Sequence, residues 1–312
     1  YEISLGLVGS EMCIRDSSGY AIEWESCIWV FDYYRGKIPD WEKTKPLIIF
    51  ASHAHKDHFA PEIFSLFKEF EHVTYLLSTD IRKKIKRMSL DEKVLAQIRY
   101  ATPGEQLSLP VSEGKEILVN VFDSTDCGVS FLVTYEERKI FHAGDLNCWI
   151  WEEESKAERN SMLARYQREI QKLPENLIDC AFLPVDYRLG ASYDYGARYF
   201  LEHVKVSHVF PMHLWGRYSI VETFRNSFRD PKEREKIVSV KQAGQQWEFG
   251  VVTEIVEPDF GCEGRPDEGK VKDQVFVQLE NGEKRLLEIE DQELYERGID
   301  EGSSLLIERG KE

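Results

Sequence analysis

The sequence predicts a layered α/β domain that is followed by a smaller β-rich unit. Strand-like and helix-like segments alternate along most of the 312 residues, which is typical of α/β layers. Apolar runs such as residues 47–51 and 180–185 have the length and composition of strands that are buried on both faces. From about Val251 the character of the chain changes, and residues 258–270 are rich in Gly, Pro and charge, which indicates a linker or a long loop.

The elements of the first domain can be assigned in order from their periodicity. Two strands are expected within residues 20–32, and a buried strand is expected at residues 47–51. Apolar residues at helical spacing predict a helix at residues 60–70. A strand at residues 73–77 should lead into a helix that Thr79-Asp80 could cap. Further strands are expected at residues 117–122, 129–134, 139–142, 180–185, 209–212 and 237–240, and helices at residues 152–173 and 218–228.

Turn chemistry predicts the small C-terminal unit. Asn281-Gly282 lies between two alternating runs and is a strong hairpin signal, because both residues tolerate positive φ. The segment SSLLIERG at residues 303–310 is typical of a last strand. We therefore expect a main domain over residues 18–250 and a β-rich unit over residues 257–312.

The first 17 residues do not fit this scheme. They contain no initiating Met, no basic region and no cleavage site of a signal peptide. The segment LVGSEMCIRDS at residues 7–17 instead resembles the in-frame translation of an adapter from a transposon-based sequencing library. We therefore expect residues 1–17 to be a non-native N-terminus that contributes little to the core.

Composition and charge restrict the possible function. The formal net charge is −16, and an acidic surface repels a phosphate backbone, so general nucleic-acid binding is disfavoured. No apolar run approaches the length of a membrane span. The six cysteines form no C-x-x-C pair and no disulfide framework, which favours a reducing, cytoplasmic setting. The oligomeric state is left open.

The strongest chemical signal is the segment SHAHKDH at residues 52–58, directly after a buried strand. Three of the eight histidines of the chain lie there. In an extended stretch His53 and His55 share a face, so they can ligate one ion. Asp57 and His58 follow after the chain turns and can serve a neighbouring ion. Imidazole and carboxylate ligands predict one or two divalent metal ions, with zinc as the first choice and iron or manganese as alternatives.

The pattern H-x-H-x-D-H after an apolar strand resembles the metal motif of the metallo-β-lactamase superfamily. The resemblance implies an αββα sandwich over residues 18–249, with one or two metals at a sheet edge. Later motifs follow in the order that the resemblance implies. Asp32 matches an acidic residue that supports the loop with the metal motif, residues 52–58, which we call the metal loop. Asp145 in FHAGD matches an aspartate that bridges two metals. His213, after the run VFPM, matches the last histidine ligand.

One motif departs from the family pattern. The third motif normally supplies a histidine before a Gly-containing turn, but residues 123–130 contain none. Asp126 is the best substitute by position, and Cys127 is a lesser alternative. Asp126 could instead serve turn chemistry before Gly128. A carboxylate at this position would complete the ligand set of one metal: His53, His55, Asp126 and Asp145.

Other polar and aromatic residues could line the site. His142 is expected to be a core histidine or to support a ligand. Asp186, after a buried strand, could support a ligand, contact the substrate or cap a helix. Loop aromatic residues that follow the site strands could form a substrate wall or pack in the core: Trp149, Trp151, Trp215, Tyr187 and Tyr193.

With the resemblance, these residues predict a hydrolase that uses a metal-bound hydroxide, since a metal lowers the pKa of bound water to about 7. The expected substrate is a small-molecule ester, lactone or phosphodiester. Asp57 and His58 are the expected catalytic residues, and Asp57 would hold a second metal or orient the attacking water. One alternative is a nuclease of the same superfamily, which the acidic charge disfavours. The other is a non-catalytic metal-binding or scaffold protein, which the missing histidine supports.

Overall fold

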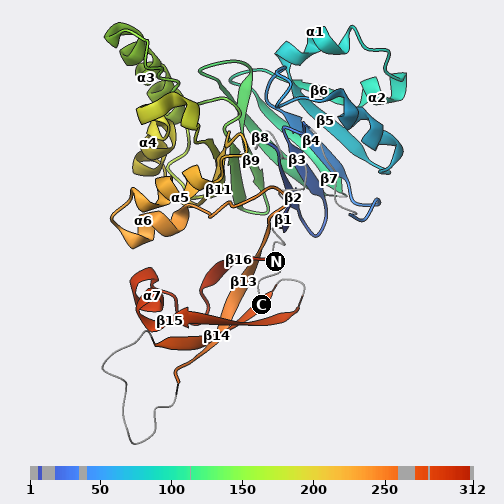
Figure 1. Cartoon of the computed structure of the whole chain (residues 1–312). Helices are drawn as coiled ribbons and strands as arrows, with labels where there is room; N and C mark the ends of the chain where they lie inside the picture. Colours follow the sequence, from blue (N-terminus) through green and yellow to red (C-terminus); the bar gives the residue numbers. More distant parts are fainter. Residues whose placement is uncertain are drawn as a thin grey trace, which may run out of the picture.

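The computed structural model describes residues 6–8, 18–34, 41–112, 114–258, 271–279 and 282–309. Within them two β-sheets pack face to face, and helices cover the outer face of each sheet (Figure 1). This is the predicted αββα sandwich.

The first sheet has the strand order β15-β14-β13-β1-β2-β3-β4-β5-β6, and β16 also pairs with β13. Strands β3 to β6 are parallel to one another, so their carboxyl ends lie at the same edge. From β2 to the edge strand β6, the strands are β2 (Tyr20–Glu23), β3 (Ile28–Phe31), β4 (Leu47–Ala51), β5 (Val73–Ser78) and β6 (Ile98–Ala101).

The second sheet has the strand order β12-β11-β10-β9-β8-β7. Strands β10, β11 and β12 are parallel, while β7, β8 and β9 form an antiparallel meander. The strands are β7 (Gln106–Ser112), β8 (Lys115–Asp123), β9 (Val129–Tyr135), β10 (Arg138–His142), β11 (Ile178–Pro184) and β12 (Val206–Met212).

Helices flank both sheets, and the longest of the described helices lies beside the second sheet. Beside the first sheet lie η1 (Pro61–Lys68), η2 (Thr79–Ile81), α1 (Arg82–Ile85) and α2 (Glu92–Ala96). Beside the second lie α3 (Lys156–Ile170), α4 (Tyr195–His203), α5 (Ser219–Asn226) and α6 (Pro231–Lys236). No helix in the described part of the chain is long and apolar enough to cross a membrane.

Two apolar clusters hold these layers together. One fills the space between the sheets, where Phe31 and Phe50 stack with ring centroids 4.4 Å apart. The other packs the outer face of the first sheet, including Ile49 and Tyr75, against Phe64 of η1. Fully burying such a side chain contributes roughly 1.5–3 kcal/mol. The strands of the first sheet are thus packed on both faces.

Several predicted elements differ in form or extent. Residues 60–70 contain the 3₁₀ helix η1 rather than an α-helix. The charged helix begins at Lys156, later than predicted, because Ser155 and Glu158 form a reciprocal capping box. Residues 237–240 contain no strand beyond an isolated bridge from Ile237 to Val209. The predicted cap at Thr79-Asp80 is wrong, because the N-cap positions of η2 and α1 are Ser78 and Ile81, and the Asp80 carboxylate accepts a hydrogen bond from the Ala54 amide at 2.9 Å instead.

The C-terminal unit has an apolar cluster of its own, which includes Val252, Val277 and Leu305. Strands β14 and β15 form the predicted hairpin, although Asn281 lies outside the described residues. The first part of β13 pairs with β1 and β16, and its second part pairs with β14. The elements are β13 (Gln246–Val256), β14 (Lys272–Leu279), β15 (Lys284–Glu290), α7 (Asp291–Arg297) and β16 (Ser304–Glu308).

Part of the N-terminal segment lies in the first sheet. Strand β1 (Gly6–Val8) pairs in the antiparallel sense with both β2 and β13. The rest of residues 1–17 lies outside the described part of the chain. The expectation that this segment is non-native and adds little to the core therefore stays a prediction.

Candidate metal centre

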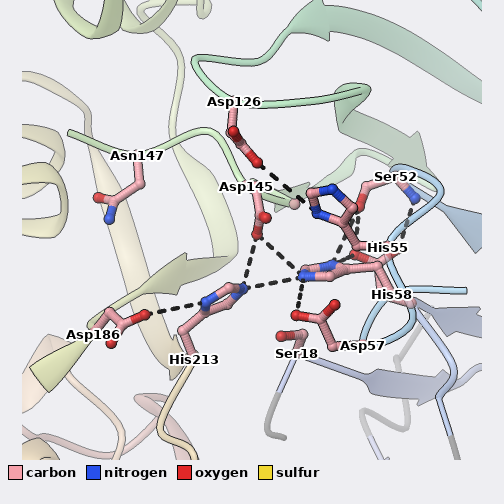
Figure 2. Close-up of polar contacts among 12 residues, drawn as sticks. Ser18, Ser52, His55, Asp57, His58, Asp126, Asp145, Asn147, Asp186 and His213 are labelled. Atoms are coloured by element: carbon pink, nitrogen blue, oxygen red, sulfur yellow. Dashed lines mark hydrogen bonds and ion pairs between the residues drawn. The ribbon is translucent and has the colours of Figure 1, made fainter. Parts of the chain in front are cut away.

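Histidines and carboxylates gather where strands of both sheets end. Strand β4 leads into residues 52–58, β10 leads into the turn that carries Asp145, and β12 leads into His213. Backbone hydrogen bonds within the sheets fix the direction of these side chains. Figure 2 shows Asp145 directed at the two imidazoles of His58 and His213.

Asp145 is the common neighbour of three imidazoles. Its Oδ1 lies 2.8 Å from Nε2 of His213 and 3.1 Å from Nε2 of His58. Its Oδ2 lies 3.2 Å from Nε2 of His53. A carboxylate in this position can offer one oxygen to each of two ions.

Among the residues that the structure describes, three groups of side chains bring their ligand atoms within 4.8 Å of one another. Two of them contain predicted ligands alone: His53, His55 and Asp145 in one, and Asp57, His58 and His213 in the other. The third comprises His55, Asp126 and Cys127. His53 Nε2 is buried and makes no hydrogen bond, although it faces Asp145. A buried imidazole nitrogen without a donor, beside converging carboxylates, fits a divalent transition metal.

Asp32 supports the histidines of the metal loop from their Nδ1 side, as the resemblance implied. It is fully buried, and its Oδ1 accepts a hydrogen bond from the Ser52 amide at 2.7 Å. Its Oδ2 lies 2.7 Å from His58 Nδ1 and accepts from Ser52 Oγ at 2.6 Å. Ser52 Oγ in turn lies 3.0 Å from His53 Nδ1. With Nδ1 engaged in this way, both histidines present Nε2 to the site.

Asp186 supports the last histidine. Its Oδ2 lies 3.5 Å from His213 Nδ1 and accepts a hydrogen bond from Trp215 Nε1 at 3.3 Å. It also forms an ion pair with Arg188 and caps the 3₁₀ helix η3 (Tyr187–Ser192). The carboxylate therefore takes two of the three roles left open by the sequence.

His142 is a buried histidine that supports the turn before Asp145. Its Nδ1 accepts a hydrogen bond from the Gly144 amide at 3.2 Å, so Nε2 carries the proton and donates to the Ser18 carbonyl at 3.2 Å. Its ring stacks on Phe31 with centroids 5.0 Å apart. Burial lowers the pKa of His142, which keeps the ring neutral.

Three residues at the site have backbone conformations that are unusual for side chains with a Cβ. Asp32, His213 and Trp215 have φ values of 47°, 60° and 49°. Such conformations cost on the order of 1–3 kcal/mol each and persist where the surrounding structure enforces them. Here the contacts of Asp32 and Asp186 supply that enforcement.

The charges of the cluster are strongly coupled. Burial works to raise the pKa of Asp145, but His58 and His213 outweigh it and hold this pKa well below its usual range. Burial works to lower the pKa of His213, but Asp145 and Asp186 outweigh it and raise this pKa to about 9. A metal ion that binds here would have to displace the proton of His213.

The predicted aromatic residues fall into three sets. Trp149 and Trp215 pack beside His213, with ring centroids 5.6 and 6.0 Å away. Tyr193 packs against Phe224 at 6.5 Å. The other two, Trp151 and Tyr187, are partly exposed.

The sequence did not predict some of the contacts that hold the site together. Asp80 and Lys84 both bind the backbone of Ala54, between the first two histidines of the motif. Ser52 links Asp32 to two histidines. The signal for Asp80 was present, since it follows a buried strand in the same way as the ligands do.

The side chains of His55 and Asp126 are less enclosed than the others. His55 Nδ1 lies 4.0 Å from Asp126 Oδ2, and the two side chains are 54% and 45% exposed. Figure 2 shows the Asp126 carboxylate directed at the His55 ring. The sequence-predicted ligands thus lie in one cluster, with this pair on its exposed side.

No protein-family model matches the chain, and no curated protein matches it. Several solved structures are similar in fold. A candidate metal-dependent hydrolase from Parabacteroides distasonis is 16% identical, with a TM-score of 0.47 over 72% of this chain and 89% of that chain. The metallo-β-lactamase fold protein YhfI from Bacillus subtilis is 12% identical, with a TM-score of 0.45 over 79% and 97%. Zn²⁺-bound PqqB from Methylobacterium extorquens is 11% identical, with a TM-score of 0.42 over 77% and 97%. These values are too low to transfer an activity.

Proposed function

We propose that the chain is a metal-dependent hydrolase of the metallo-β-lactamase superfamily that acts on a small-molecule ester, lactone or phosphodiester. The observation that carries the proposal is the convergence of His53, His58 and His213 on the Asp145 carboxylate. A divalent ion at such a site supplies a hydrolytic nucleophile near neutral pH and polarises the bond under attack.

The ligand groups support two adjacent metal positions. We call the position of Asp57, His58 and His213 the inner position, and that of His53 and His55 the outer position; Asp145 belongs to both. Nitrogen and oxygen donors favour zinc, with iron and manganese as alternatives. Asp57 Oδ2 lies 3.4 Å from His58 Nε2, where it can hold the inner ion or, with one ion bound, orient the attacking water.

A cavity beside the metal loop has the size of a small-molecule site, although none of the candidate metal ligands lines it. This cavity of about 560 Å³ is lined by Tyr33, Tyr34, Lys56, Phe59 and Lys84, and so lies beside the metal loop. Small-molecule sites are commonly about 300–1,000 Å³ in volume. The net charge of −16 argues against a nucleic-acid substrate.

Elemental analysis and a substrate panel test the proposal. Protein purified without chelator should contain zinc, iron or manganese, and should hydrolyse at least one generic ester, lactone or phosphodiester. His58→Asn should lose metal and activity, whereas His203→Asn, on the exposed end of α4, should keep both. Protein that holds no metal and takes up neither zinc, iron nor manganese would contradict the proposal. Bound metal without any hydrolysis would favour the non-catalytic alternative.

A further inference from the structure

A third ligand group extends the outer metal position away from Asp145. His55, Asp126 and Cys127 bring one nitrogen, one oxygen and one sulfur within 4.8 Å of one another. His55 also belongs to the group of His53 and Asp145. His55 is thus shared by two separate ligand groups, one with His53 and Asp145 and one with Asp126 and Cys127.

The turn that carries Asp126 and Cys127 is fixed by its neighbours. Thr125 Oγ1 donates to the Asn147 carbonyl at 2.5 Å and accepts from the Asn147 amide at 3.0 Å. Arg165 donates to the Thr125 carbonyl at 2.7 Å. At the other end of the turn, the Val129 amide donates to the Ser52 carbonyl at 2.9 Å. The turn is thus attached to the Asp145 loop on one side and to the metal loop on the other.

Turn chemistry does not account for the Asp126 carboxylate. The Asp126 amide is satisfied by Ser124 Oγ at 3.2 Å, and Thr125 supplies the side-chain contacts to Asn147. Among the described contacts, the Asp126 carboxylate makes no hydrogen bond to the turn backbone, and it is directed at His55. The turn backbone is therefore held by Ser124 and Thr125, and the Asp126 carboxylate is left to the two side chains beside it, His55 and Cys127.

His53 Nε2, on the same side of the site, is buried and, among the described residues, has only the Asp145 carboxylate beside it, with Oδ2 at 3.2 Å. His53 Nε2 is fully buried, and the ring of His53 lies 4.6 Å from the ring of His55, centroid to centroid. A buried polar atom without a donor calls for a ligand, and here it belongs to the group that includes His55.

We propose that Asp126 and Cys127 together take the place of the missing histidine of the third motif and give the outer metal position a thiolate ligand. This inference rests on the proposed metal centre, but not on any particular substrate. The outer ion then has nitrogen, oxygen and sulfur donors, while the inner ion has nitrogen and oxygen donors alone. A thiolate selects softer ions such as zinc over magnesium, calcium or manganese.

Cobalt(II) is the probe, because a thiolate ligand gives it a charge-transfer absorption band in the near ultraviolet. The full chain is stripped of metal and titrated with cobalt, and metal content is measured at each step. The wild-type protein should show the thiolate band. Cys127→Ser and Cys127→Ala should both lose it while they keep cobalt at the inner position. Cys148→Ala, a buried cysteine outside the ligand groups, is the matched control and should keep the band.

Asp126→Asn provides a second measurement. It should weaken cobalt binding at the outer position, so that the band grows in at higher cobalt concentration but still reaches its full height. Cobalt binding without a thiolate band, or a band that survives both Cys127 variants, would overturn this inference and leave the proposed hydrolase standing. Failure of the stripped wild-type protein to bind cobalt, zinc, iron or manganese would instead sink the metal centre itself.

Discussion

Two buried carboxylates, Asp32 and Asp186, lie beside the Nδ1 atoms of the two histidines of the proposed inner metal position. Asp32 lies 2.7 Å from Nδ1 of His58, and Asp186 lies 3.5 Å from Nδ1 of His213. A carboxylate on Nδ1 fixes the tautomer and the ring orientation, and it raises the basicity of the nitrogen that faces the metal. The strength of metal binding should therefore depend on residues that never touch the ion.

Asp32→Asn tests this dependence. The amide keeps the size of the side chain but offers only one acceptor, so it cannot serve Ser52 and His58 as the carboxylate does. We expect zinc affinity to fall by about 10–100-fold, since that is the usual cost of such a loss. Competition with a chromophoric chelator measures the affinity.

Asp179→Asn is the matched control for this variant. Asp179 accepts a hydrogen bond from the Lys139 amide at 2.8 Å near the start of β10, at the end of that strand away from the metals. Its replacement should leave zinc affinity unchanged. Equal losses in the two variants would show that the effect comes from general destabilisation.

The metal-free protein should lose stability as pH rises above neutrality. The pKa of His213 is raised to about 9, mainly by Asp145, against the opposing effect of burial. An unfolded histidine titrates near about 6.5. A pKa that is raised on folding stabilises the protein fully below the unfolded value, and this contribution is lost as pH rises through the folded value.

Thermal melts across this pH window provide the measurement. The Tm of stripped protein should fall between the unfolded and the folded pKa of His213. Zinc-loaded protein should show a weaker dependence, because the metal then holds the unprotonated imidazole. A flat Tm in the stripped protein would show that the pairing of His213 with Asp145 adds no stability.

At the scale of elements, the apolar strands were the most predictable part of the fold. Strand β4 has the predicted bounds, and β5 and β9 each extend only one residue further, because buried strands are continuous apolar runs. Strands β6 and β7 were missed because both are partly exposed and lack a clear period. The composition shift near Val251 suggested a boundary, but β13 runs through it as one strand.

Part of the candidate site could likewise be predicted from the sequence, and part of it could not. The cluster at residues 52–58 could be found because its ligands are contiguous and follow a buried strand. The contact of Asp80 with Ala54 joins two loops, so it depends on how β4 and β5 pair. The role of Asp126 stayed open in the sequence, because a turn residue and a ligand look alike until the hydrogen bonds of the turn are known.

Gly128 should be essential to the turn of the third motif. Its φ is +70°, and an added Cβ would lie 2.0 Å from the Ser52 carbonyl oxygen and 2.4 Å from His53 Cβ. Gly128→Ala should therefore be destabilising by more than the roughly 1–2 kcal/mol of a left-handed alanine, because the metal loop has to move. Metal content should fall with it. Urea unfolding and elemental analysis measure the two effects.

Gly104→Ala separates the backbone cost of a left-handed alanine from the clash of the added Cβ with the metal loop. Gly104 has a φ of +87°, but an added Cβ there would meet nothing within 4 Å. This variant should show the backbone cost alone and keep its metal. If the two variants lose the same stability and both keep their metal, the methyl group added at Gly128 does not displace the metal loop.

At the scale of the whole molecule, none of the candidate ligands found among the described residues comes from the C-terminal unit. The main sandwich and this unit have separate apolar clusters, and β13 belongs to both. Its Trp247 packs in the main cluster against Phe210, with ring centroids 5.4 Å apart, whereas its Val252 packs in the C-terminal cluster. The unit should therefore be separable at a point after Trp247.

Truncation after Val256 tests whether the unit is an appendage. The shortened chain should keep the metal content of the full chain, because residues 52–58, Asp126, Asp145 and His213 all remain. Its Tm should be lower, because β13 loses its pairing with β14 and β16 and Val252 becomes exposed. Truncation after Gln245 is the comparison, and it should cost much more stability because it also removes Trp247 from the main cluster. Loss of metal or aggregation after the first cut would show instead that the C-terminal strands are part of the main core.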